Sequence, residues 1–234
     1  MKELTVVCTC PESEQELLEF VQALARFAVS FHGFAVCLLL VDNLGVSRTY
    51  SNEVEAALSV LPFTVKIEAT LGVKQFYALF EAAFSVRSGV VVTMDPDMAA
   101  NIQDLPVFYG KIEEGKQLIF SVRKQREDVG MLRSLGSLFF NGLLRFVFKV
   151  PVKDANTPMI MFCSSLSSMF KEFPAAAGYP KFYYPYVLGD KFCELPIVVH
   201  SKPKRSSYSW TLLFLLGLQQ LKQAYQFSRF IRKH

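Results

Sequence analysis

Short apolar runs alternate with helix-like segments along the first 95 residues of the chain. Continuous apolar or β-branched runs predict buried strands at residues 4–10, 34–41, 63–67 and 89–94. Apolar side chains at helical spacing predict helices between them, one that begins after Ser13 and others at residues 52–60 and 74–88. Ser13 and Glu16 have the form of a capping box, in which each side chain binds a backbone N–H group at the helix start.

The alternation of strands and helices predicts a mostly parallel sheet joined by right-handed crossovers. In such a sheet, ligands bind in the crevice outside the carboxyl ends of the strands. We therefore expect the residues that follow three of the strands to converge there: Pro11 and Glu12, Asp42 and Asn43, and Asp95, Pro96 and Asp97.

Beyond Asp97 the pattern predicts another strand and an unusual helix. A helix is expected at residues 102–114, a strand at 117–122 and a further helix from Met131. On that last helix Arg133, Ser137 and Asn141 would form one polar line, flanked by Leu132, Leu135, Phe139, Leu143 and Phe146. This pattern fits either a helix that lies in a membrane interface or a core helix with a polar edge.

Composition excludes the disordered and membrane-spanning classes. The 234 residues are 51% hydrophobic, which is ample for a core. The longest apolar runs, near residues 34–41 and 212–218, are shorter than the roughly 18 residues that span a bilayer. The five cysteines form no C-x-x-C pair, so we expect core thiols. No signal peptide precedes the first strand, which favours a cytoplasmic protein.

The charge is distributed unevenly along the chain. The formal net charge of +4 divides into −3 before His200 and +7 from His200 onward. Residues 201–234 therefore form a basic, aromatic segment with Trp210 near its start. Such a segment either attaches to anionic lipid or packs as a C-terminal helix with a solvated end.

Asp95 and Asp97 are the sharpest chemical signal. Two carboxylates one residue apart at the end of a buried strand can hold Mg²⁺ or Mn²⁺ against a diphosphate, with water and phosphate oxygens as the other ligands. The alternative is ordinary turn chemistry with solvated charge. No G-x-G-x-x-G follows the first strand and no G-x-x-x-x-G-K-[ST] occurs, so dinucleotide and P-loop sites have no support.

The order of three further motifs makes the chain resemble a known family. The strand "VTMDPD" is followed by the loop "VRKQRED" and by the helix "LRSLGSLFFNGLLR", which leads into "VPVKDA". In this order they resemble glycosyltransferase family 2, and within it the polyprenyl-phosphate sugar transferases such as dolichol-phosphate mannose synthase and undecaprenyl-phosphate aminoarabinose transferases. The likeness extends from Val6 to the "SSYS" at residues 206–209.

The resemblance implies an α/β GT-A fold, a Rossmann-like, mostly parallel sheet flanked by helices, with C-terminal amphipathic helices. It implies an inverting transfer from a UDP- or GDP-linked sugar to a polyprenyl phosphate, aided by Mg²⁺ or Mn²⁺, in the synthesis of cell-envelope polysaccharide. No nucleic acid is expected as a partner. The nucleotide sugar would be bound by Pro11, Glu12, Asp42 and Asp95, the metal by Asp95 and Asp97, and the acceptor phosphate by Arg123, Arg126 and Arg133.

A lipid phosphate acceptor needs no catalytic base, because a phosphate monoester is largely deprotonated at neutral pH. Catalysis would then rest on Asp97 with its metal, and on Arg123 and Arg133, which orient the attacking oxygen and neutralise the leaving diphosphate. Neither His32 nor His200 is an evident base, and we expect both to be structural.

Departures from the family pattern keep two alternatives open. The first strand ends in the residues 9–13, "TCPES", which lack the aromatic residue and the Asn-Glu pair of the family, and Met98 and Ala99 replace the customary Leu-Gln. These losses fit a degenerate, non-catalytic binding protein on a transferase fold. A second alternative is transfer to a sugar hydroxyl of a polysaccharide, for which Asp190 is the candidate base.

The resemblance also suggests how the chain is divided. Residues 1–200 would form the transferase domain, with a nucleotide-sugar half at about 1–98 and an acceptor half at about 99–200. Residues 201–234 would hold the enzyme as a peripheral protein on the inner face of the membrane.

Overall fold

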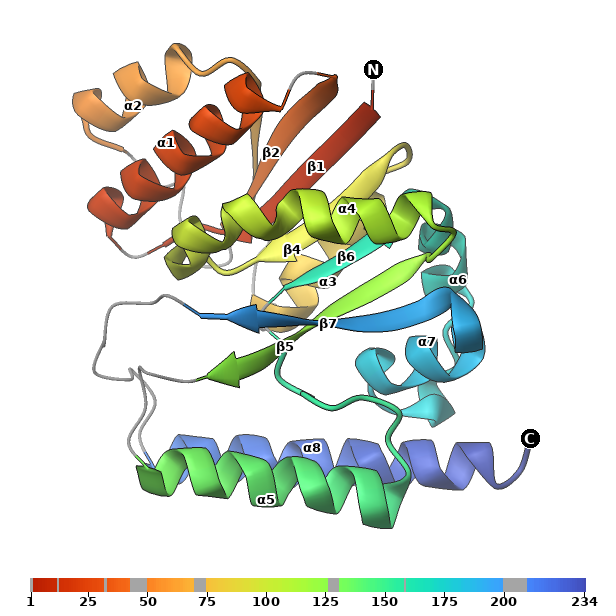
Figure 1. Cartoon of the computed structure of the whole chain (residues 1–234). Helices are drawn as coiled ribbons and strands as arrows, with labels where there is room; N and C mark the ends of the chain where they lie inside the picture. Colours follow the sequence, from red (N-terminus) through yellow and green to blue (C-terminus); the bar gives the residue numbers. More distant parts are fainter. Residues whose placement is uncertain are drawn as a thin grey trace.

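The computed structural model of the chain describes residues 2–11, 13–31, 33–42, 50–69, 75–125, 131–157, 159–199 and 210–234. Within them, seven strands form one sheet in the order β3-β2-β1-β4-β6-β5-β7 (Figure 1). The strands are β1 (Lys2–Thr9), β2 (Phe34–Asp42), β3 (Thr64–Ala69), β4 (Val90–Met94), β5 (Leu118–Gln125), β6 (Ile160–Cys163) and β7 (Phe192–Val198).

All of these strands except β6 point in one direction. β1 pairs in parallel with β2 and β4, β2 with β3, and β5 with β7, whereas β6 runs antiparallel to both β4 and β5. The carboxyl ends of six strands therefore lie at one edge of the sheet. Because β6 is reversed, the loop that leads into it reaches the same edge.

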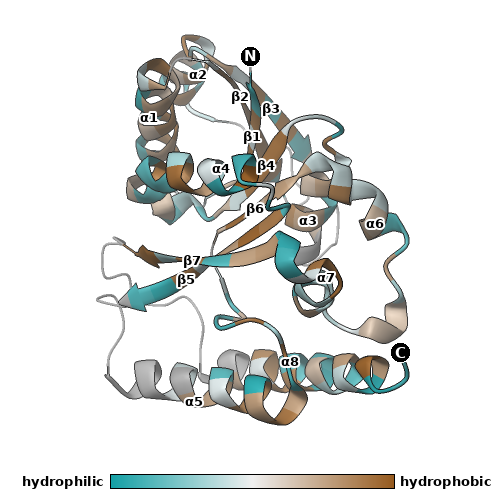
Figure 2. Cartoon of the chain, turned by 45° about the vertical axis from the view of Figure 1, so that its right-hand side comes forward, coloured by the Kyte–Doolittle hydropathy of each residue, from teal (hydrophilic) through white to brown (hydrophobic). Residues whose placement is uncertain are grey.

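Helices cover both faces of the sheet. They are α1 (Glu14–Ser30), α2 (Asn52–Ser59), α3 (Gln75–Ser85), α4 (Leu105–Glu113), α5 (Met131–Phe148), α6 (Ser167–Lys171), α7 (Pro180–Leu188) and α8 (Trp210–Ile231), with short 3₁₀ segments η1 (Pro96–Asp104), η2 (Ser164–Leu166), η3 (Ala175–Ala177) and η4 (Gly189–Lys191). α5 and α8 lie side by side in a layer beyond the sheet (Figures 1 and 2).

Two apolar cores, one on each face, explain why the strands read as continuous apolar runs. Val6 and Leu38 face the core formed with α1, η1 and α4, where Phe20 and Phe108 are fully buried. The next residue in each strand, Val7 or Leu39, faces the core formed with α3, α7 and the end of α8. A strand covered on both faces has no polar side of its own.

Most of the predicted elements are confirmed, with small corrections. The predicted strands and helices of the first 122 residues all form within a few residues of the predicted bounds. Ser13 is the N-cap of α1, but its side chain makes no capping hydrogen bond. The carboxylate of the next residue, Glu14, instead accepts a hydrogen bond of 2.8 Å from the backbone N–H of Ser51. The four-residue strand β6 was not among the predicted strands.

The C-terminal helix α8 is packed along one side. Ala224, Phe227 and Ser228 are buried, and Gly178 lies so close to α8 that a Cβ there would be 2.5 Å from the carbonyl oxygen of Gln223. Among the residues described, no helix is both long enough and apolar enough to cross a membrane. All five cysteines are free thiols, and Cys8 and Cys10 are buried.

Replacing Gly89 with alanine should destabilise the protein more than the same change at Gly115. Both glycines have positive φ, 76° and 93°, which costs a residue with a Cβ about 1 kcal/mol or more. Only at Gly89 would the new Cβ clash, at 2.6 Å from the carbonyl oxygen of Glu3 in β1.

We expect urea unfolding to show a loss of about 1 kcal/mol for Gly115→Ala and of about 3 kcal/mol or more for Gly89→Ala. Equal losses would show that β1 does not approach Gly89 this closely.

Candidate functional site

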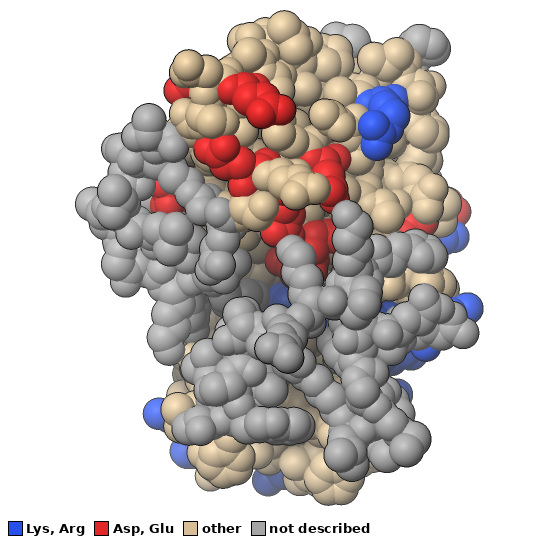
Figure 3. Space-filling view, turned by 90° about the vertical axis from the view of Figure 1, so that its left-hand side faces the viewer, with Lys and Arg blue, Asp and Glu red and all other residues tan. Residues whose placement is uncertain are grey.

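Acidic side chains gather at the carboxyl edge of the sheet. Asp42 is the last residue of β2 and is buried, and Asp95 and Asp97 directly follow β4. β2 and β4 flank β1, whose Cys8 pairs with Met94 and whose Thr9 pairs with Val41. Figure 3 faces this edge and shows Asp and Glu side chains grouped across its described surface. The predicted convergence is confirmed for the described residues, whereas Glu12 and Asn43 lie outside them.

Asp95 holds a proton more tightly than an ordinary carboxyl group. Desolvation of its carboxyl group raises the pKa of Asp95 to about 6, and the neighbouring charges of Asp97 and Glu16 add to the rise. Lys181 and Arg123 oppose it. Desolvation and the two neighbouring carboxylates thus both favour the neutral form of Asp95.

A divalent metal would find two carboxylates here. Asp95 and Asp97 offer hard oxygen atoms of the kind that Mg²⁺ and Mn²⁺ prefer. Within the described part of the chain, no group of three or more His, Cys, Asp or Glu side chains could hold a metal. If Asp95 and Asp97 bind a metal, its other ligands would have to come from water and a bound diphosphate.

Arg123 is bound to a carboxylate. Its Nε donates to Asp154 Oδ2 at 2.7 Å and its Nη2 donates to Asp154 Oδ1 at 2.8 Å. Both side chains are largely buried, with exposed fractions of 14% for Arg123 and 7% for Asp154. Although burial alone would raise it, the pKa of Asp154 is lowered, because Arg123 and the backbone N–H of Asn156 donate to the carboxylate. Arg123 was predicted to bind the acceptor phosphate, but two of its guanidinium nitrogens already donate hydrogen bonds to Asp154.

Residues 154–157, the loop before β6, are bound from several elements. The backbone N–H of Ala155 donates to Asn141 Oδ1 of α5 at 3.2 Å. The hydroxyl of Thr157 lies 2.8 Å from that of Ser121 in β5. The carbonyl oxygen of Thr157 accepts a hydrogen bond of 3.1 Å from Lys181 Nζ of α7. The loop is thus fixed at the end of β5, beside Arg123.

Lys181 is a functional candidate that sequence reasoning missed. It is only 6% exposed, and burial lowers its pKa to about 8, although Asp95 and Asp154 act to raise it. A lysine in the aromatic run "GYPKFYYPY" was the available signal, because a cation among apolar residues is seldom buried without a charged partner. It places a buried positive charge within electrostatic reach of Asp95 and Asp154.

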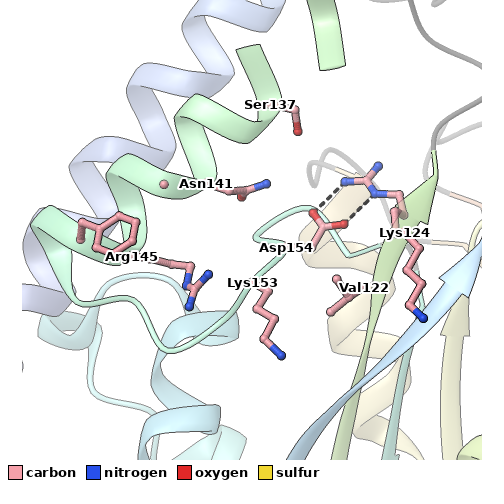
Figure 4. A pocket seen from close by; sticks show the side chains of 10 residues that line it. Val122, Lys124, Ser137, Asn141, Arg145, Lys153 and Asp154 are labelled. Atoms are coloured by element: carbon pink, nitrogen blue, oxygen red, sulfur yellow. Dashed lines mark hydrogen bonds and ion pairs between the residues drawn. The ribbon is translucent and has the colours of Figure 1, made fainter. Parts of the chain in front are cut away.

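A basic cavity of about 460 Å³ lies between β5 and α5 (Figure 4). It is lined by Val122, Arg123, Lys124, Ser137, Asn141, Gly142, Arg145, Phe146, Lys153 and Asp154. The predicted polar line of α5 is confirmed at Ser137 and Asn141, and Arg145 continues it by one turn. The side chain of Arg133 and all of Arg126 lie outside the described residues.

Asp190 lies far from the acidic edge. It belongs to η4, immediately before β7, and β7 runs parallel to β5. Asp190 therefore lies at the amino end of β7, at the opposite edge of the sheet from Asp95 and Asp97. The candidate base for a sugar hydroxyl acceptor does not reach the site.

No family model matches the chain, and none of the curated proteins matches it in sequence. Solved structures match its fold. A mycobacterial protein superposes with a TM-score of 0.61 and 12% identity over 95% of this chain and 75% of its own. For 4-diphosphocytidyl-2C-methyl-D-erythritol synthase from Anaerococcus prevotii the TM-score is 0.56, with 10% identity over 92% of this chain and 96% of its own.

A mannosyltransferase from Pyrobaculum calidifontis, in complex with GDP-Man and Mn²⁺, has a TM-score of 0.54 and 14% identity over 98% of this chain and 64% of its own. At these identities the likeness concerns the fold. The mostly parallel sheet flanked by helices is the α/β fold of GT-A nucleotide-sugar transferases. The fold class predicted from the sequence is thereby confirmed.

Asp154→Asn should destabilise the protein strongly, because it leaves the largely buried guanidinium of Arg123 without its counter-charge. We expect a loss of about 3 to 5 kcal/mol in urea unfolding at neutral pH. Glu114→Gln is the control, since it breaks an exposed ion pair with Lys111, and should cost less than about 1 kcal/mol.

The effect should depend on pH. Because the folded protein lowers the pKa of Asp154, the pair's contribution is complete above the unfolded value of about 4 and is lost as the pH falls below it. The native protein and Asp154→Asn should therefore converge in stability in acid. A difference that does not change with pH would contradict the ion pair.

Proposed function

We propose that the chain is an inverting glycosyltransferase that moves a sugar from a UDP- or GDP-linked donor to a polyprenyl phosphate. The observation that carries the proposal is the convergence of Asp42, Asp95 and Asp97 at the carboxyl edge of a GT-A sheet. Ligands of open α/β sheets bind at this edge. A mannosyltransferase with GDP-Man and Mn²⁺ that shares the fold supports a nucleotide-sugar donor.

Each half of the transferase domain would bind one substrate. Pro11, Glu12 and Asp42 would contact the nucleoside, and Asp95 and Asp97 would hold Mg²⁺ or Mn²⁺ at the diphosphate. When bound, the metal would neutralise charge on the leaving diphosphate. The first half, residues 1–98, would thus serve the donor, and residues 99–200 would serve the acceptor.

Catalysis would require charge and position more than proton transfer. Arg133 and Arg126 would attract the acceptor phosphate towards the sugar. The two hydrogen bonds to Asp154 would hold the positive charge of Arg123 in a fixed position. A lipid phosphate reacts as an anion, so the absence of Asp190 from the carboxyl edge favours it over a sugar hydroxyl.

A membrane surface would bring the acceptor to the enzyme. On α5, Phe139 and Phe146 are 77% and 75% exposed, and on α8 Phe214 is 67% exposed. Apolar side chains on two neighbouring helices, together with the basic end of α8 from Arg229 onward, fit a bilayer interface with anionic lipid. These features support our proposal that the enzyme works as a peripheral protein on the inner face of the membrane.

Asp97→Asn should abolish sugar transfer and weaken the binding of UDP or GDP in the presence of Mn²⁺ by at least about tenfold, because one metal ligand is lost. Titration calorimetry and transfer of radiolabelled sugar to undecaprenyl phosphate would measure both effects. Asp190→Asn is the control and should change neither.

Loss of transfer to a saccharide in Asp190→Asn would favour the hydroxyl acceptor instead. If neither nucleotide binds the native chain with Mg²⁺ or Mn²⁺, the chain is a non-catalytic member of the fold.

The double variant Phe139→Ser/Phe214→Ser should sediment with vesicles of phosphatidylglycerol and phosphatidylcholine at least about tenfold less than the native protein. Each replacement removes the roughly 1.5 to 3 kcal/mol that burial of a phenylalanine side chain in the bilayer would contribute. The melting temperature should not change, because both side chains are exposed. Val60→Ser/Val107→Ser, which alters two exposed valines outside α5 and α8, should sediment like the native protein. Equal sedimentation of all three proteins would remove the membrane role.

A further inference from the structure

The edge strand β3 has one side open to a further strand. It lies at the end of the sheet opposite to β7, and among the described strands it pairs only with β2 (Figure 2). All of its residues except Val65 are exposed, and Ile67 is 51% exposed. The backbone N–H and C=O groups along the outer side of an edge strand can bind another strand.

The side chains of β3 alternate between two different faces. Val65 packs against the core that contains α1, so Ile67, two residues further on, lies on the same face. Lys66 and Glu68 lie on the other face, where both line a cavity of about 540 Å³. Neither makes an ion pair with another residue that the structure describes. The strand thus offers one apolar face and one face with a single charge of each sign.

This pattern is complementary to itself when the strand is reversed. In an antiparallel pair, residues directly opposite each other share a face. Two copies of β3 related by a two-fold axis must therefore place one residue opposite its own counterpart. Only two registers overlap five residues of the strand, one centred on Lys66 over residues 64–68 and one centred on Ile67 over residues 65–69.

Charge distinguishes these two registers. The register centred on Lys66 places two lysines opposite each other, which is unfavourable. The register centred on Ile67 places Lys66 opposite Glu68 of the second copy and, by symmetry, Glu68 opposite Lys66 of the second copy. It also places the two exposed Ile67 side chains together on the apolar face. A second copy of this chain therefore matches the edge in one register.

We propose that the chain forms a two-fold symmetric dimer in which two β3 strands pair antiparallel about Ile67 and join the two sheets. The contact is one short strand from each copy, at the small end of interfaces, which bury about 1,200 Å² or less. We therefore expect a weak dimer whose population depends on protein concentration. The dimer goes beyond the proposed function, because its formation needs neither nucleotide nor acceptor.

Charged side chains on an edge strand also have an ordinary role, since they keep the strand from pairing with others. That role does not depend on which charge stands at which position. The proposed register, in contrast, requires unlike charges at positions 66 and 68. Exchanging the charges therefore separates the two explanations.

The experiment is sedimentation equilibrium of the full chain at low ionic strength, where exposed ion pairs are least screened. Lys66→Glu should weaken the dimer by at least about tenfold, because symmetry turns both ion pairs into like-charge pairs. Glu68→Lys should do the same. Lys66→Glu/Glu68→Lys exchanges the charges and should restore the native dissociation constant within about threefold.

Lys222→Glu is the matched control, since it makes the same charge change at an exposed position of α8. It should leave the dissociation constant within about threefold of the native value. All the replaced side chains are exposed, so each variant should also keep the native melting temperature.

The two single variants are complementary to each other. An equimolar mixture of Lys66→Glu and Glu68→Lys should form heterodimers at least about tenfold more tightly than either variant forms dimers alone. A native chain that stays monomeric up to about 0.5 mM would overturn the inference. So would single variants that dimerise like the native chain, or a mixture that associates no more tightly than its components.

Discussion

Residues 154–157 are held by four elements, and this constraint shapes the part of the molecule that β5, α5, α7 and α8 form. β5 contributes the ion pair from Arg123, α5 an amide, α7 a buried ammonium and α8 the amide of Gln220, which donates to Asn156. The reversed strand β6 makes this possible, because the loop before it then arrives at the carboxyl edge. Without that reversal Asp154 would lie at the other end of the sheet.

The site combines opposite charges in neighbouring places. Acidic side chains lie at the ends of β2 and β4, and a basic cavity lies beside β5. Lys181 is buried and interacts electrostatically with both Asp95 and Asp154. The basic cavity by itself attracts anions, whereas the carboxylates of the acidic group would attract one only through a bound cation.

Local patterns predicted most of the elements. A strand covered on both faces must be apolar throughout, and a helix buried on one face must repeat its apolar residues every three to four positions. They failed where a distant residue decides the outcome. The side chain of Ser13 does not cap α1, although it has the right sequence neighbours. Arg123 matches an arginine of the family that the sequence resembles, yet its partner Asp154 is 31 residues away. Lys181 belongs to no motif that would have predicted its role.

The sequence by itself determined the fold class, the acidic residues at the strand ends and the polar line on α5, because each depends on periodicity or on neighbours along the chain. Only the tertiary structure decided which cations pair with carboxylates and which are buried. That choice depends on pairs formed across elements, such as Arg123 with Asp154, and on the burial of Lys181. The free energy of a charge is set by the groups around it in space, and their distances are not encoded in any local pattern.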